Sequence, residues 1–111
     1  MNLLHIKGKV DKWISENVER RADEIYEMFV EFVKTIAPIA DNRFKKVDKW
    51  NIELLDEAID SICDYLNGNS TVIVLWDEIW DARVEGRGIG IDKIRMFFEL
   101  INKVEKKVVR E

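Results

Sequence analysis

The sequence predicts an all-α protein in which about four helices form an antiparallel bundle. Apolar residues recur every three or four positions along most of the chain, which is the spacing of one helix face. Short polar breaks separate these segments, and short connections between helices favour antiparallel neighbours. A length of 111 residues allows one core, so we expect residues 1–111 to form a single helical domain.

The first apolar stripe runs from Val10 to Ile36 and predicts a helix with an acidic opposite face. The single proline, Pro38, is expected to end the pattern, because proline lacks the N–H that a helix interior needs. Asp41 and Asn42 then favour a turn.

A second stripe runs from Val47 to Leu66 and predicts another helix. Asp48 is a plausible N-cap or first-turn acid at its start. The sequence 67–69, Asn-Gly-Asn, is expected to stop this helix, because both residue types tolerate left-handed backbone.

The third segment is ambiguous. Residues 71–76 are rich in β-branched side chains and read alone as a short buried strand. Helical spacing continues to Arg83, however, with Ser70 as a possible cap, and only a weak strand over residues 3–7 is available as a partner. We therefore favour a helix here. A fourth helix from Ile91 to Val108 is expected from its regular stripe.

The five residues Lys-Val-Asp-Lys-Trp occur at 9–13 and again at 46–50. Shifting the sequence by the distance between the two copies also aligns later apolar residues with each other, as expected of a duplicated helical unit. Chance similarity of two helix beginnings explains the echo equally well. In either case we expect Trp13 and Trp50 to pack at equivalent corners of the bundle.

Composition excludes several classes of protein. No apolar run approaches the ~18 residues of a membrane span, and residues 1–10 are too charged for a signal peptide, so we expect a cytoplasmic protein. One cysteine, Cys63, allows no internal disulfide, and one histidine, His5, excludes most histidine-based metal sites. We expect no cofactor. The absence of glutamine, with abundant Glu, Lys, Arg, Ile and Val, is typical of thermophilic proteins.

The charges are unevenly distributed. Residues 1–82 carry 10 Lys or Arg against 17 Asp or Glu, whereas residues 83–111 carry 8 against 5. No cation lies between Trp50 and Ala82. We expect the middle helices to be acidic and the last helix basic, and such faces attract each other within a bundle or between subunits.

The connection before the last helix is a candidate nucleic-acid site, because glycine amides and a helix N-terminus hold phosphates well. The residues are Arg87, Gly88, Gly90, Lys93 and Arg95. The turn at 88–90 resembles the hairpin of helix-hairpin-helix DNA-binding motifs, although Ile94 stands where that family usually has a small residue. Residues 92–101 also resemble a helix of the small helical subunits of type III CRISPR effector complexes, which line an RNA-bearing filament. Both resemblances imply nucleic acid as a partner.

Paired acids one helical turn apart suggest a second type of site. Two such pairs on neighbouring helices would supply oxygen ligands for Mg²⁺. The residues are Glu57, Asp60, Glu78 and Asp81. All-helical nucleotide pyrophosphohydrolases of the MazG type use a related layout, although Asp60 here replaces a glutamate of their first pair. This resemblance implies a metal-dependent nucleotide hydrolase. The simpler interpretation is a solvated helix face.

Aromatic residues suggest the third and preferred site. Trp76 and Trp80 lie four positions apart, and a small bundle has difficulty burying four tryptophans. Large aromatic side chains often anchor protein interfaces. The sequence therefore predicts a helical interaction or assembly module without enzymatic activity, which binds itself or a protein partner and no membrane. Nucleic-acid binding is the first alternative, and the hydrolase is the second.

Overall fold

The computed structural model describes residues 2–110 and is helical over most of them, which confirms the all-α prediction. Short non-helical segments separate the helices, and two of these segments contain a strand of two residues. The elements in chain order are α1 (Leu3–Glu16), β1 (Arg20–Arg21), α2 (Ala22–Ala40), the 3-10 helix η1 (Asn42–Lys46), α3 (Ile52–Tyr65), α4 (Thr71–Glu85), β2 (Gly88–Ile89) and α5 (Ile91–Arg110).

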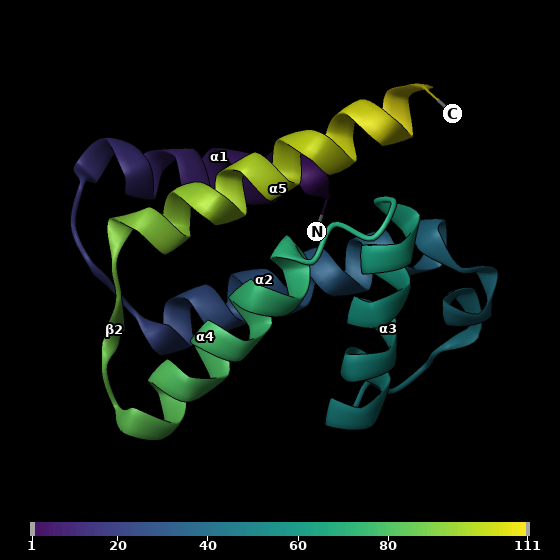
Figure 1. Cartoon of the computed structure of the whole chain (residues 1–111), viewed down its shortest axis with the longest axis horizontal. Coiled ribbons are helices and arrows are strands. Elements are labelled where there is room, and N and C mark those ends of the chain that lie inside the picture. Colours follow the sequence, from purple (N-terminus) through teal and green to yellow (C-terminus); the bar gives the residue numbers. More distant parts are fainter. Residues whose placement is uncertain (1, 111) are drawn as a thin grey trace.

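The helices form two layers (Figure 1). The first and last helices, α1 and α5, lie side by side along most of their lengths. Beneath them, α2 packs against both α3 and α4. The layers meet where α5 crosses α4 and where α1 contacts α2. We refer to these groups as the α1/α5 layer and the α2/α3/α4 layer.

A two-stranded antiparallel ribbon joins the two connections between these layers. Arg20 of β1 pairs with Ile89 of β2, and Arg21 pairs with Gly88. The chain enters β2 through Gly86, which ends α4 in a left-handed conformation with φ of 69°. The tight helix-to-helix turn expected at residues 88–90 is therefore wrong, because this segment is extended and paired.

The stripe predicted from Val10 to Ile36 belongs to two helices. Asn17 adopts left-handed backbone with φ of 52° and ends α1, donating its N–H to the carbonyls of Trp13 and Ile14. Val18 then lies exposed in the link to β1. The apolar spacing continues across the break because α2 returns Ala22 to the core. Residues 3–7, considered above as a weak strand, are the first turns of α1.

Pro38 does not end α2, which continues to Ala40. A proline this close to the end of a helix removes only one late hydrogen bond. Ile36 and Ala37 are fully buried and hold the final turn against the core. The predicted turn follows at Asp41, whose carboxylate accepts a hydrogen bond from the N–H of Arg43 at 3.0 Å.

The helix predicted from Val47 begins later, at Ile52. Its N-cap is Asn51, whose side-chain oxygen accepts the N–H of Leu54 at 2.8 Å, and Asp48 lies in a bend before the helix. Phe44 of η1 stacks on Trp50 at 5.8 Å, so aromatic packing shapes this segment. The predicted stop is confirmed, since Asn67 and Gly68 both have positive φ.

The two copies of Lys-Val-Asp-Lys-Trp have different structures. Residues 9–13 lie inside α1, where Trp13 is buried. Residues 46–50 begin at the last residue of η1 and are not α-helical, and Trp50 there is half-buried against Phe44. The expectation of equivalent tryptophan corners is therefore wrong, and the echo marks no repeated structural unit.

Residues 71–76 are helical, as favoured above, and form the start of α4. Ser70 occupies the N-cap position without a side-chain capping bond. Asn69 provides the cap instead, because its Oδ1 accepts the Thr71 N–H at 3.0 Å and the Thr71 hydroxyl at 2.6 Å. The last helix is confirmed as α5. None of the described helices is long and apolar enough to cross a membrane.

The core is centred on three phenylalanine rings from both layers. Phe29 lies 5.4 Å from Phe97 and 6.0 Å from Phe32, and Phe32 meets Phe97 edge-on at 5.5 Å. All three are essentially inaccessible to solvent. Ring pairs at these separations add to the free energy gained by burying their apolar surface.

We predict that Phe29→Ala lowers the free energy of unfolding by about 3–5 kcal/mol, because it leaves a cavity where α2, α4 and α5 meet. Denaturant unfolding followed by circular dichroism measures the change. Val109→Ala, at a position that is 80% exposed, is the control and should change stability by less than about 0.5 kcal/mol. Similar losses in the two variants would contradict this account of the core.

Candidate protein-interaction surface

Trp76 of α4 connects three helices. Its ring stacks on Tyr26 at 5.9 Å and on Phe29 at 6.0 Å, both from α2. Its indole Nε1 donates a hydrogen bond of 2.9 Å to Oδ1 of Asp56 on α3. Only 7% of the residue is exposed. Trp76, predicted as an interface residue, is therefore mainly a core residue whose outer edge reaches the surface.

Trp80, one turn further along α4, is the exposed member of the pair. Its ring lies 5.7 Å from that of Trp76, and 37% of the residue is accessible. The guanidinium of Arg83 covers the Tyr26 ring at 3.7 Å and lies 5.6 Å from the Trp80 ring. Packing against Trp76 and Arg83 holds the Trp80 ring in place, and a rigid, partly exposed tryptophan is a good interface anchor.

A groove of about 420 Å³ lies between the start of α3 and the middle of α4. Its apolar surface comes from the two tryptophans and from Ile52, which is 42% exposed. Its acidic rim has three aspartates. The lining residues are Ile52, Asp56, Trp76, Asp77, Trp80 and Asp81, and we call this set the aromatic groove. Exposed Val84 extends the apolar surface beyond Trp80.

The rim of the aromatic groove carries negative charge that the protein does not neutralise. Asp77 and Asp81 are exposed and pair with no cation among residues 2–110. Asp56 accepts the Trp76 N–H but has no cationic partner among the same residues. An apolar floor with unpaired carboxylates favours a ligand with both apolar and positively charged groups.

The charge asymmetry seen in the sequence separates the two layers. Helices α2, α3 and α4 carry thirteen acids and two cations. Helices α1 and α5 carry nine cations and five acids. The structure thus places a strongly acidic layer beneath a basic one, and the aromatic groove lies on the acidic layer.

The five predicted nucleic-acid residues lie along one connection but have different surroundings. Arg87 donates hydrogen bonds to Glu85 at 2.5 Å and to Glu78 at 2.7 Å, and these carboxylates raise the pKa of its guanidinium. Gly88 is in the ribbon, where a Cβ would collide with the side chain of Glu19. Gly90 accepts the first helical N–H groups of α5. Lys93 contacts the Met96 sulfur at 3.8 Å, and Arg95 is exposed.

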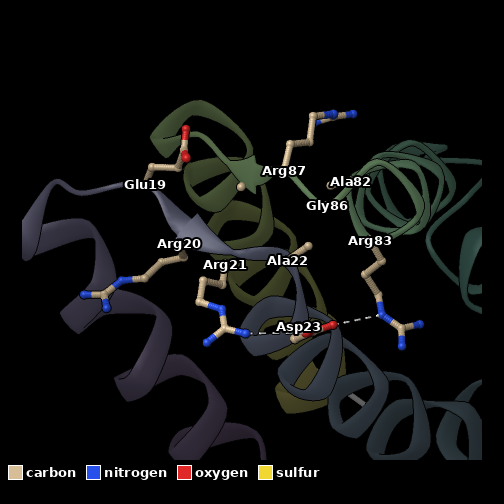
Figure 2. A pocket seen from close by; sticks show the side chains of 10 residues that line it. Glu19, Arg20, Arg21, Ala22, Asp23, Ala82, Arg83, Gly86 and Arg87 are labelled. Atoms are coloured by element: carbon tan, nitrogen blue, oxygen red, sulfur yellow. Dashed lines mark hydrogen bonds and ion pairs between the residues drawn. The ribbon is translucent and has the colours of Figure 1, made fainter.

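A cleft beside the ribbon contains four arginines (Figure 2), but their side chains do not converge. Arg21 and Arg83 both approach Asp23, at 3.9 and 3.3 Å. Arg20 and Arg87 point away from Asp23 and from each other, and Arg20 pairs with Glu16. Because each arginine already has an acidic partner, the cleft offers little free positive charge to a phosphate. Nucleic-acid binding at residues 87–95 stays a prediction without support from this geometry.

The four predicted metal ligands do not form a common site. Glu57 lies 3.8 Å from Arg43, and Glu78 pairs with Arg87. Asp60 and Asp81 are exposed. Within residues 2–110, no group of three or more His, Cys, Asp or Glu side chains is placed to hold a metal ion. The hydrolase alternative has no geometric support in this part of the chain.

The sequence predicted Trp80 as an interface residue, and the structure shows it partly exposed in the groove, but two other groove residues were not predicted. Asp56 was not singled out, because nothing in the order of residues shows that it meets Trp76, twenty positions later. Ile52 was not singled out because the helix was expected to start earlier. The run of acids without cations between Trp50 and Ala82 was the signal that could have identified the rim.

We predict that Asp56→Ala lowers the free energy of unfolding by about 1 kcal/mol, because the half-buried indole N–H of Trp76 loses its acceptor. Asp60→Ala is the matched control, since it removes the same charge from an exposed position of α3 that does not accept the Trp76 N–H. The difference between the two denaturation curves measures the hydrogen bond. Equal stabilities would show that this bond contributes nothing.

Cys63 gives a prediction about pH. Burial raises the pKa of its thiol, and the nearby carboxylates of Asp64 and Asp60 raise it further. Because the thiolate is the reactive form, the rate of alkylation by iodoacetamide should reach its midpoint at higher pH in the folded protein than in the urea-unfolded chain. Asp64→Asn should move the folded midpoint downward. A folded midpoint at or below that of the unfolded chain would contradict this.

The chain matches no protein-family model, and no curated protein or solved structure shows significant similarity to it. The function is therefore inferred from the surface of the molecule itself. The aromatic groove is the feature whose shape, apolar floor and uncompensated charge together define a class of ligand.

Proposed function

We propose that this protein is a helical interaction module, without catalytic activity, that binds a basic protein segment in the aromatic groove. The observation that carries the proposal is the partly exposed Trp80 beside two unpaired aspartates, Asp77 and Asp81. Trp80 provides an apolar anchor, and the carboxylates select a cationic partner over an anionic one.

Lysine and arginine side chains fit this surface well. Their methylene stems pack on apolar surface while their charged ends remain near water and carboxylates. A cation above the face of tryptophan gains a further attraction of about 0.5–1 kcal/mol at an exposed site. Arg83 already makes this type of contact with Tyr26 at 3.7 Å, and it also lies 5.6 Å from the Trp80 ring of the groove.

The fixed geometry of the groove also favours binding. Trp76 cannot turn away without breaking its hydrogen bond to Asp56 and its stacking on α2. Trp80 packs on Trp76, so its ring requires little ordering when a ligand arrives. Groups that are already in place bind with a smaller loss of conformational entropy than mobile ones.

The test is a fluorescence titration with a synthetic helical peptide of lysine, leucine and alanine. We expect saturable binding that changes the tryptophan emission and weakens as salt screens the rim charges. The same peptide with glutamate in place of lysine should not bind. Failure of the lysine peptide to bind the wild-type protein at low salt would refute the proposal.

Matched variants distinguish peptide binding in the aromatic groove from attraction of the peptide to the acidic surface in general. Trp80→Ala should weaken peptide binding at least about tenfold, which is the scale of an interface anchor, while Val18→Ala, an exposed apolar residue elsewhere, should not. Asp77→Asn with Asp81→Asn should weaken it, whereas Asp60→Asn with Asp64→Asn removes the same charge outside the groove and should have a smaller effect. Equal effects of the two acidic pairs would contradict a specific site.

A further inference from the structure

The α1/α5 layer presents a surface with the properties that the aromatic groove requires of its ligand. Arg95, Lys103 and Lys106 recur along α5 at helical spacing and are exposed. Lys103 and Lys106 have no hydrogen-bond or ion-pair partner among residues 2–110. Val109, one turn beyond Lys106, is 80% exposed and adds an apolar group. We call Lys103, Lys106 and Val109 the basic knob.

The spacing of the knob matches the spacing of the groove. Lys103 and Lys106 are three residues apart on one helix, and Asp77 and Asp81 are four apart on another. Residues at either separation are neighbours on a helix surface, roughly 5–6 Å apart at Cβ. Two lysines can therefore meet two aspartates at the same time, and Val109 is then available to contact Trp80 or Ile52.

The two surfaces cannot meet within one molecule. The groove includes the start of α3 and the middle of α4. The C-terminal end of α5 lies on the opposite side of the molecule from the start of α3 (Figure 1). A contact between knob and groove therefore needs a second copy of the chain.

We propose that the basic segment bound by the aromatic groove is the basic knob of another copy, so that the protein assembles head to tail. This inference rests on the proposed function, because it names the occupant of the same groove. The two contacting surfaces differ, so an open chain of copies keeps one unused groove at one end and one unused knob at the other. Such heterologous contacts form rings or open chains rather than closed two-fold dimers.

Sedimentation velocity at low salt tests the proposal with the whole chain. The wild-type protein should show an average mass that rises with concentration and falls on adding salt. Asp77→Lys with Asp81→Lys should be monomeric, because knob and groove are then both positive. Lys103→Glu with Lys106→Glu should also be monomeric, because both surfaces are then negative. Each loss should correspond to at least a tenfold weaker association.

Mixing these two double variants is the decisive step. Each contact in the mixture again joins opposite charges, so the mixture should assemble although neither variant does so alone. Asp60→Lys with Asp64→Lys makes the same change of charge outside the groove and should assemble like the wild type. Circular dichroism checks that every variant is folded, which is expected because all the substitutions lie on exposed positions.

The possible results distinguish the two proposals. A wild-type protein that stays monomeric but binds the lysine peptide would overturn the head-to-tail assembly and leave the proposed function standing. A protein that neither assembles nor binds the peptide would overturn both. Assembly that both double variants retain would place the interface elsewhere and overturn the knob-and-groove contact. A mixture of the two double variants that stays monomeric would also overturn it.

Discussion

The indole of Trp76 on α4 contacts both other helices of the acidic α2/α3/α4 layer. One face stacks against Tyr26 and Phe29 of α2, and the N–H reaches across to Asp56 of α3. Phe29 also packs against Phe97 of α5, so Phe29 links the Trp76 ring to that helix. The exposed Trp80 packs on its outer edge. The core and the candidate binding groove are therefore parts of one aromatic cluster, and a change in the core should be felt at the surface.

Periodicity predicted the helices well where their apolar faces are continuous, as in α4 and α5. It failed at breaks that keep the apolar phase. Asn17 ends α1 through its left-handed backbone, yet apolar residues keep a spacing of three or four positions from Val10 to Ile36 across this break. It also failed at the start of α3, where Asn51 caps the helix and Trp50 lies before it, stacked on Phe44. Trp80 was identifiable from its residue type and spacing. Asp56 was not, because its partner is known only once α3 and α4 are packed.

The net charge of −4 conceals how the charges are arranged. Thirteen acids on three helices and nine cations on the other two give the molecule a strong internal asymmetry. Most of the ion pairs that it does form are local. Arg87, for example, meets Glu85 and Glu78 near its own helix end, and Arg20 meets Glu16 one turn away. Lys7 and Glu105, at 2.8 Å, join α1 to α5 within one layer. The exposed charges of the groove rim and of the basic knob have no partner of opposite charge within residues 2–110, so they are available to other molecules.

The ribbon is small and consists of Arg20, Arg21, Gly88 and Ile89. The chain passes from one layer to the other only twice, between α1 and α2 and between α4 and α5, and each of these connections contains one strand of the ribbon. Together with the packing of α5 on α4 and of α1 on α2, the ribbon holds the angle between the basic α1/α5 layer and the acidic α2/α3/α4 layer. In a head-to-tail chain this angle recurs at every copy, because one layer receives the preceding molecule and the other docks into the next. That angle would then set the rise and twist of the whole assembly. A rigid ribbon would give a regular helix or a closed ring, and a pliable one would give a bending filament.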